Sequence, residues 1–246
     1  MKKQIKMQRD FLKADKWIEW DNLDRDQKNG VSAPLVTKDY PEDEDLIDLI
    51  PYDELDVGDS SLKKIMKQRK SRRKYTDEKL SLEELSFLLW STQAVKENKN
   101  KRTVPSAGAR HPFETYLYIN KVKNLKKGIY RYLPVEHKLI FIYNENNLNL
   151  KIAGACRKQK FIADSAVIFI WTAVPYRSEW RYDVLAHKMI ALDAGHLCQN
   201  LYLASESVGA GTCAIGAYYQ QPVDDLLDID GEEEFVIYLA SVGKVE

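Results

Sequence analysis

The chain has 246 residues, enough for one compact domain with a sizeable core, and 44% of them are apolar, which argues against disorder. Its 37 Lys and Arg residues balance its 37 Asp and Glu residues. A net charge of zero gives no general electrostatic reason to bind nucleic acid or an anionic membrane, so any anion site must be local.

Cysteine usage and hydropathy limit the compartment and the kind of site. Cys156, Cys198 and Cys213 are widely spaced and form no CxxC pair, which is typical of a reduced cytosolic protein and predicts no metal site. The N-terminus starts basic but lacks the apolar stretch of a secretion signal, and the longest apolar run, 166–174, is too short to cross a membrane. We therefore expect a cytoplasmic protein that binds neither membrane nor nucleic acid.

Residues 1–60 form a polar, acid-rich segment with three prolines and no sustained periodicity. We interpret it as an arm, with the main domain spanning 61–246. Scattered apolar residues suggest that the arm lies against another surface, although a disordered tail is the alternative; these residues are Phe11, Trp17, Trp20, Ile47, Leu49 and Ile50.

The main domain shows a sequence of helix and strand patterns. Ser81 and Glu84 form a capping box that opens a helix over 82–93. A long helix is predicted from about Tyr182 to Ser207, and Gly195 within it suggests close packing against another helix or a ligand. A basic helix is predicted over 61–71, and strands over 113–120, 128–134, 138–144, 166–174 and 232–246. Without a strict βαβ rhythm, this mixture indicates an α+β fold.

A run of cations, Arg69-Lys70-Ser71-Arg72-Arg73-Lys74-Tyr75, stands at the end of the first of these helices. Guanidinium groups bind phosphate oxygens through paired donors, and lysine and serine add further contacts, so the run could hold a phosphate. A solvated face, or a docking patch for an anionic partner, would explain the same residues.

Two further segments are rich in small residues. The stretch 102–110 contains Pro105-Ser106-Ala107-Gly108, a tight loop that would allow close approach to a flat ring or a phosphate, or simply join a helix to a strand. The stretch 210–218 carries Gly211 and Gly216 but does not match GxGxxG, so it does not support a dinucleotide fold.

Taken in order, RKSRRKY, FLLWSTQ, RTVPSAGARHPFE, LDAGHLCQNLYLAS, AIGAYY and LASVGK resemble the nitroreductase-like FMN oxidoreductases over residues 61–246. PSAG before a strand, and DAGH before QNLYLA, are most similar to the SagB-type dehydrogenase branch, which oxidises azoline rings on peptides. The resemblance implies a mainly antiparallel central sheet flanked by helices, a homodimer, and an FMN cofactor.

The resemblance also assigns roles to particular positions. It implies that FMN phosphate is held by the basic run and by a lysine after a glycine near the C-terminus. It places the PSAG loop on the flavin of the other subunit, and the end of the third segment beside flavin N5. The implied cofactor-binding residues are Arg69, Lys70, Ser71, Arg73, Pro105, Ser106, Ala107, Gly108, Ile215, Gly216 and Lys244.

One departure concerns catalysis. The azoline branch has a Lys-Tyr pair ahead of the long helix, whereas this chain has Arg181-Tyr182. Arginine stays protonated and cannot act as a general base, so Tyr182 is the candidate acid or base, with a packed aromatic as its alternative. We expect His196 to be a core or interface histidine and Cys213 to be a buried, inert thiol.

The function implied is an FMN-dependent oxidoreductase that transfers hydride through flavin N5 to or from a small molecule or peptide, with NAD(P)H as a possible electron donor. The alternative is a flavin-binding protein without turnover, acting as a sensor or as a subunit of a complex.

Overall fold

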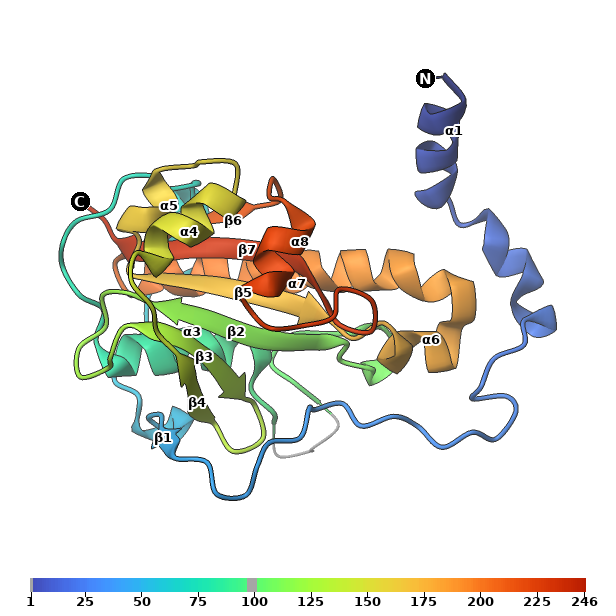
Figure 1. Ribbon diagram of the computed structural model, residues 1–246, viewed down its shortest axis with the longest axis horizontal. Coiled ribbons are helices and arrows are strands. Elements are labelled where there is room, and N and C mark those ends of the chain that lie inside the picture. The colour runs from blue at the N-terminus through green and yellow to red at the C-terminus, as the bar shows by residue number, and fades with distance from the viewer. Residues whose placement is uncertain (1, 97–100) are drawn as a thin grey trace.

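A computed structural model describes residues 2–96 and 101–246 (Figure 1). Its centre is a seven-stranded sheet in the order β1-β4-β3-β2-β5-β7-β6, in which every neighbouring pair is antiparallel. The strands are β1 Leu46–Asp48, β2 Phe113–Ile119, β3 Gly128–Leu133, β4 Lys138–Tyr143, β5 Val167–Ala173, β6 Ala210–Ile215 and β7 Phe235–Lys244. The predicted α+β class with a mainly antiparallel sheet is therefore confirmed.

Helices cover both faces of this sheet (Figure 1). On one face lie α3 and α7, and on the other lie α4, α5 and α8. The helices are α1 Lys2–Phe11, α2 Leu62–Gln68, α3 Leu82–Gln93, α4 Leu148–Ala155, α5 Phe161–Asp164, α6 Tyr176–Tyr182, α7 Ala186–Ser207 and α8 Gln220–Asp225. No helix in the described ranges is long and apolar enough to span a membrane.

The central strand β5 shows why its sequence is continuously apolar. Phe169 and Trp171 point into the core shared with α3 and α7, whereas Ile168 and Ile170 point into the core shared with α4, α5 and α8. Because successive side chains of a strand face opposite sides, a strand covered on both sides must be apolar at every position.

Most predicted elements are confirmed, including the capping box, in which the Ser81 hydroxyl accepts from the Glu84 N–H and the Glu84 carboxylate from the Ser81 N–H. The first basic helix ends at Gln68, not near Ser71, because Ser71 pairs with Thr212 at the sheet edge. The long helix starts at Ala186, because Asp183, with φ of 47°, breaks the chain direction after α6.

Two segments near α7 differ from what local patterns suggested. Residues 210–215, for which no strand was predicted, form the edge strand β6, whose small side chains let α7 and the 70–75 segment lie close. Gly195 is exposed, and a Cβ built there would meet nothing within 4 Å, so it makes no close packing contact within this chain, and its packing against another helix or a ligand stays a prediction.

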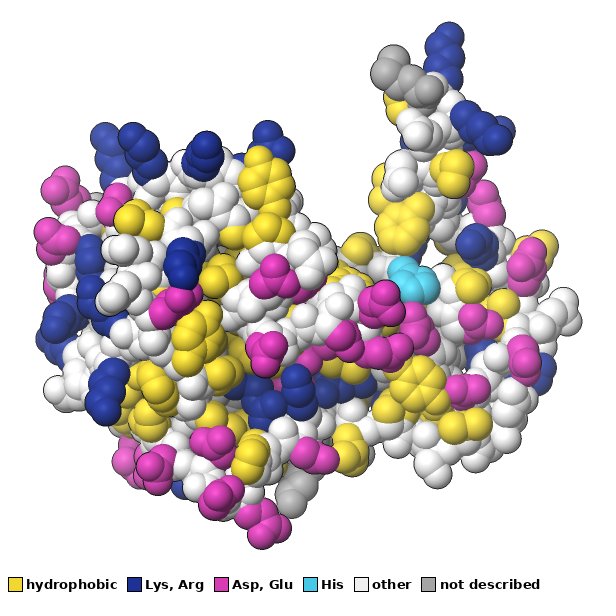
Figure 2. Space-filling model, in the orientation of Figure 1, with side chains coloured by type: hydrophobic (Ala, Val, Ile, Leu, Met, Phe, Trp, Pro, Cys, Tyr) yellow, Lys and Arg dark blue, Asp and Glu magenta, His cyan; other side chains and the backbone are white. Residues whose placement is uncertain are grey.

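The first 60 residues divide into two parts. Helix α1 stands away from the body and has no buried residue (Figures 1 and 2). Residues 12–50 instead follow the surface of their own subunit, and β1 adds an edge strand to the sheet. Of the predicted anchors, Ile47, Leu49 and Trp20 pack on the core, while Phe11 stays exposed.

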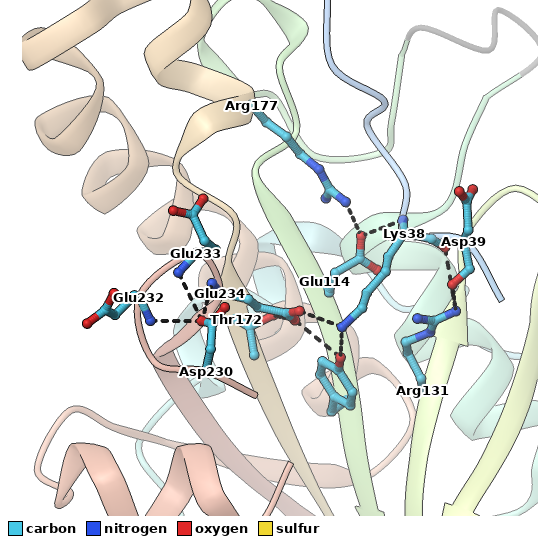
Figure 3. Close-up of polar contacts among 11 residues, drawn as sticks. Lys38, Asp39, Glu114, Arg131, Thr172, Arg177, Asp230, Glu232, Glu233 and Glu234 are labelled. Atoms are coloured by element: carbon cyan, nitrogen blue, oxygen red, sulfur yellow. Dashed lines mark hydrogen bonds and ion pairs between the residues drawn. The ribbon is translucent and has the colours of Figure 1, made fainter. Parts of the chain in front are cut away.

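A largely buried network of ion pairs and hydrogen bonds holds the middle of this segment, at Lys38, against the main domain (Figure 3). The Lys38 N–H and the Arg177 guanidinium both donate to the Glu114 carboxylate, at 3.0 and 2.6 Å. The Lys38 ammonium lies 2.7 Å from Glu234, whose other oxygen accepts from Thr172 at 2.7 Å. Glu114 and Arg177 are almost fully buried, so removing either side chain would leave the other charge buried without its partner.

Candidate functional site

The basic run forms one wall of a cavity of about 310 Å³ beside the C-terminus. The residues that line it are Lys70, Ser71, Arg72, Arg73, Lys74, Tyr75, Thr76, Val245 and Glu246. Among the described residues, Arg69, Lys70 and Arg73 form no ion pair, whereas Arg72 is bound to Glu206 at 3.3 Å. Lys74 forms no ion pair with a described residue either, so four of the five cations of the run are not neutralised in the described part of the chain, and Arg72 is structural.

Tyr202 on α7 connects this run to β6. Its hydroxyl lies 2.9 Å from the Ser71 hydroxyl and accepts from the Ala214 N–H at 2.9 Å. The Arg69 guanidinium lies over the Tyr202 ring at 5.3 Å from its centroid. Sequence reasoning missed Tyr202, although an otherwise apolar helix face carrying a tyrosine in QNLYLA was a signal that could have revealed it.

The backbone of Lys244 lies beside the basic run, but its side chain points to other partners. The Thr76 N–H donates to the Lys244 carbonyl at 2.9 Å. The ammonium is held by the Glu84 carboxylate and by the Val208 carbonyl, and its side chain is largely buried. A phosphate contact by Lys244 stays a prediction, and it would have to compete with Glu84.

Cys213, in the second half of β6, lies next to Arg73. Cys213 is buried, as expected, and burial raises the pKa of its thiol while the Arg73 guanidinium acts in the opposite direction. Ile215 is buried at the end of β6, and Gly216 follows it as an exposed residue with open space around its Cα. An exposed backbone with no side chain could approach a flat ring closely.

The PSAG loop lies on another side of α7 and is held there by Asp193. The Ala107 N–H donates to Asp193 at 2.9 Å, and the Ser106 hydroxyl also bonds to this carboxylate. Burial raises the pKa of Asp193, while these two donors and His196 act in the opposite direction. Asp193 was not identified from the sequence, although it is an acid on the buried face of a long helix. His196, expected in a core or interface, is more than half exposed in this chain.

Tyr182 and Arg181, at the end of α6, lie against Gly108 of the same PSAG loop. Gly108 has φ of 58°, and a Cβ there would lie 2.6 Å from the Tyr182 hydroxyl and 2.8 Å from Arg181 Cδ. Glycine is therefore required both by the backbone angle and by these side chains. The buried Nε of Arg181 has no hydrogen-bond partner in the described part of the chain.

The two groups of candidate residues lie on opposite sides of α7. Asp193, which holds the PSAG loop, precedes Tyr202, which contacts Ser71, by nine positions along the helix. At 3.6 residues per turn and 1.5 Å per residue, this spacing corresponds to about two and a half turns and about 14 Å along the axis. A single chain thus brings Ser71 and Arg73 together, and Gly108 and Tyr182 together, but keeps the two pairs apart.

Comparison with known proteins gives a family. Residues 66–244 match the Nitroreductase family, so the chain belongs to it. It is 32% identical over 189 residues to MJ1384 of Methanocaldococcus jannaschii, a protein provisionally named a nitroreductase. The match covers 77% of this chain and 93% of that protein.

Three further similarities are more partial. The chain is 26% identical to the trifolitoxin-processing protein TfxB of Rhizobium leguminosarum bv. trifolii, covering 61% of this chain but only 44% of TfxB. A provisionally named nitroreductase structure from Anabaena variabilis superposes with a TM-score of 0.66 at 27% identity, over 75% of this chain and 38% of that one. The E. coli microcin synthetase McbBCD complex with truncated pro-MccB17 gives a TM-score of 0.62 at 17% identity, over 89% of this chain and 80% of that one, a likeness of fold.

Proposed function

We propose that this nitroreductase-family protein is an FMN-dependent oxidoreductase that works as a homodimer. The observation that carries the proposal is the run around Ser71, where Arg69, Lys70 and Arg73 have no carboxylate partner among the described residues. Unneutralised cations beside a cavity favour binding of a dianionic phosphate, and serine offers a hydroxyl to the same group. The family match makes the phosphate of FMN the ligand of choice.

The residues present fit the flavin in a second respect. Next to the run lies β6, which Tyr202 ties to Ser71, and the exposed Gly216, with open space around it, follows the end of this strand. Arg69, Lys70, Ser71 and Arg73 would hold the phosphate, and the backbone at Ile215 and Gly216 would face the ring. FMN, when bound, supplies hydride transfer at its N5 position.

The separation across α7 supports the proposed homodimer. If the PSAG loop contacts flavin, it does so at the flavin of a second copy, because on its own chain it lies on the opposite side of α7 from Ser71. The surface of α7 between the two sides is exposed and includes Leu192, which is 51% exposed, and Gly195. Symmetric pairing of two copies over this surface would complete two equivalent sites.

We further propose that the substrate side is formed by Tyr182 and Arg181, with a peptide or small organic molecule as substrate. Tyr182 would hold or move a proton at its hydroxyl, and Arg181 would supply positive charge that pairs with an anionic group or orients Tyr182. Support for a peptide substrate comes from the similarity to the trifolitoxin-processing protein TfxB and to the McbBCD complex with truncated pro-MccB17, and the azoline version comes from the resemblance to the SagB-type branch. Arginine in place of lysine argues that proton abstraction depends on Tyr182 alone.

The first experiment is the visible spectrum of the purified protein, followed by identification of any chromophore that heating releases. A flavin spectrum with about one FMN per chain, bleached anaerobically by NADH or NADPH, supports the proposal. Incubation with a thiazoline peptide then tests the azoline version, because oxidation to the thiazole removes one hydride and one proton from the peptide and reduces the flavin. Colourless protein that takes up no added FMN would overturn the proposal.

A further inference from the structure

The N-terminal segment lies outside the matched family region, residues 66–244, yet it places two tryptophans against Tyr182. Trp20 lies 5.9 Å and Trp17 lies 6.2 Å from the Tyr182 ring centroid, and the two indoles stack on each other at 5.2 Å. The Arg25 guanidinium covers the Trp20 ring at 3.6 Å. These contacts make an aromatic cluster, and of its two tryptophans Trp20 also packs on the main core, to which Tyr182 belongs.

The chain on either side of this cluster is tied to the body. The Lys188 ammonium donates to the Leu12 carbonyl before it. After it, the Tyr176 hydroxyl donates to Asp26 at 2.7 Å, and the Gln27 N–H donates to the Trp180 carbonyl at 2.9 Å. Because α6 carries both Tyr176 and Tyr182, the tryptophans are held in register with the helix whose end they cover.

Tyr182 itself combines a fixed ring with an available hydroxyl. Its side chain belongs to the main core, and the residue is only 9% exposed. Its hydroxyl, which faces Gly108 of the PSAG loop, makes no hydrogen bond with any described residue. A group that must contact a substrate benefits from this combination, because its position is set by packing while its hydrogen-bonding capacity is unused.

We propose that Trp20, supported by Trp17, is a positioning residue that fixes the Tyr182 ring for the reaction. The N-terminal segment is then part of the active site instead of an appendage to the family domain. This inference rests on the proposed function, since it assigns Trp20 a role through Tyr182.

The test first measures the environment of Tyr182 without using activity. The 14 tyrosines are labelled as 3-fluorotyrosine, and the Tyr182→Phe variant identifies the fluorine resonance of Tyr182. We expect Trp20→Ala to shift and narrow this resonance, and Trp20→Phe to restore most of the wild-type spectrum. Tyr52→Ala is the matched control. It removes another aromatic stack of the N-terminal segment, in which the Tyr52 and Trp90 ring centroids are 4.2 Å apart, and this stack is remote from Tyr182 (Figure 1).

The second measurement is a double-mutant cycle on protein loaded with FMN, using a thiazoline peptide or nitrobenzoate, whichever the wild-type protein turns over. We expect Trp20→Ala to lower kcat by about tenfold with little change in KM, because misplacing a reacting group lowers rate more than binding. In the Tyr182→Phe background the same substitution should have no further effect.

An unchanged Tyr182 resonance in Trp20→Ala, or equal losses of kcat with and without Tyr182, would overturn the inference. Failure of the proposed function shows separately, as wild-type protein that neither binds FMN nor turns over a substrate. The fluorine spectrum still decides in that case whether Trp20 fixes the tyrosine ring.

Discussion

On the Tyr202 side of α7, Lys70, Arg73 and Lys74 line a cavity and form no ion pair with a described residue. On the Asp193 side, a glycine-bearing loop is held by one buried acid and faces a tyrosine. The first arrangement leaves positive charge available for a ligand. The second fixes the position of the PSAG loop relative to Tyr182. The difference suggests that one side supplies affinity and the other supplies orientation. Cofactor binding and turnover should then respond to different residues.

The largest effect is expected from removing charge on the Tyr202 side. In Arg69→Ala/Arg73→Ala we expect the Kd for FMN to rise by about 100-fold or more, because each charge-assisted hydrogen bond contributes about 1.5–3 kcal/mol. Fluorescence quenching of titrated FMN measures this change. Lys67→Ala on α2 is the control, since it removes an exposed cation that does not line the cavity. Equal weakening by the control would mean that general charge, and not this site, attracts the flavin.

The opposite side should affect turnover without affecting FMN. For Tyr182→Phe we expect kcat to fall by about 100-fold, the scale of a lost acid or base, with FMN content unchanged. Steady-state kinetics on flavin-loaded protein measures it. Tyr52→Phe is the control, because Tyr52 is exposed and stacks on Trp90, outside the Tyr182 cluster. Normal kcat in Tyr182→Phe would reduce this tyrosine to a packing residue.

The two sides are expected to meet only between two copies. Leu192→Glu places a charge on the exposed face of α7, and we expect it to convert a dimer to a monomer and to weaken FMN binding by about tenfold through the loss of contacts from the second chain. Light scattering after size exclusion, with flavin content measured in parallel, checks this. Val135→Glu, on a comparably exposed residue of the β3–β4 turn, should change neither. A monomeric wild-type protein with full flavin content would contradict the dimeric site.

The smallest effect concerns Asp193 and pH. Because burial raises its folded-state pKa, the folded chain binds this proton more tightly than the unfolded chain, so stability is lost as pH rises above the ordinary value of 3.8. Asn cannot ionise, so the melting temperature of Asp193→Asn relative to wild type should improve between pH 4 and pH 7. Calorimetry at both pH values measures the difference, and the exposed Asp225→Asn is the control. A relative melting temperature that falls over this range would mean that the Ala107 and Ser106 bonds outweigh burial.

Local patterns predicted the long elements well. The capping box at Ser81, the continuously apolar β5 and the helical spacing predicted from about Tyr182 to Ser207 depend on neighbours in sequence. The structure has all three, with the long helix beginning at Ala186. They predicted β6 poorly, because a strand of small residues is stabilised by pairing with β7 and not by its own side chains.

The candidate site shows the same division. The basic run was visible as a cluster of residue types, but nothing in it showed that Arg72 is occupied by Glu206 while Arg69 and Arg73 are not. Lys244 was assigned by its place after a glycine, and its Glu84 partner is 160 positions away in sequence. Pairings over such distances follow from the topology, which local composition does not encode.

The sequence by itself determined the class of the fold and the position of the basic run, because these follow from periodicity and residue chemistry. Only the tertiary structure decided that Trp17 and Trp20 reach Tyr182, that Asp193 holds the PSAG loop, and that the two halves of the site lie on opposite sides of α7. The physical reason is that each of these contacts joins segments that approach only when the sheet assembles and α7 packs on it.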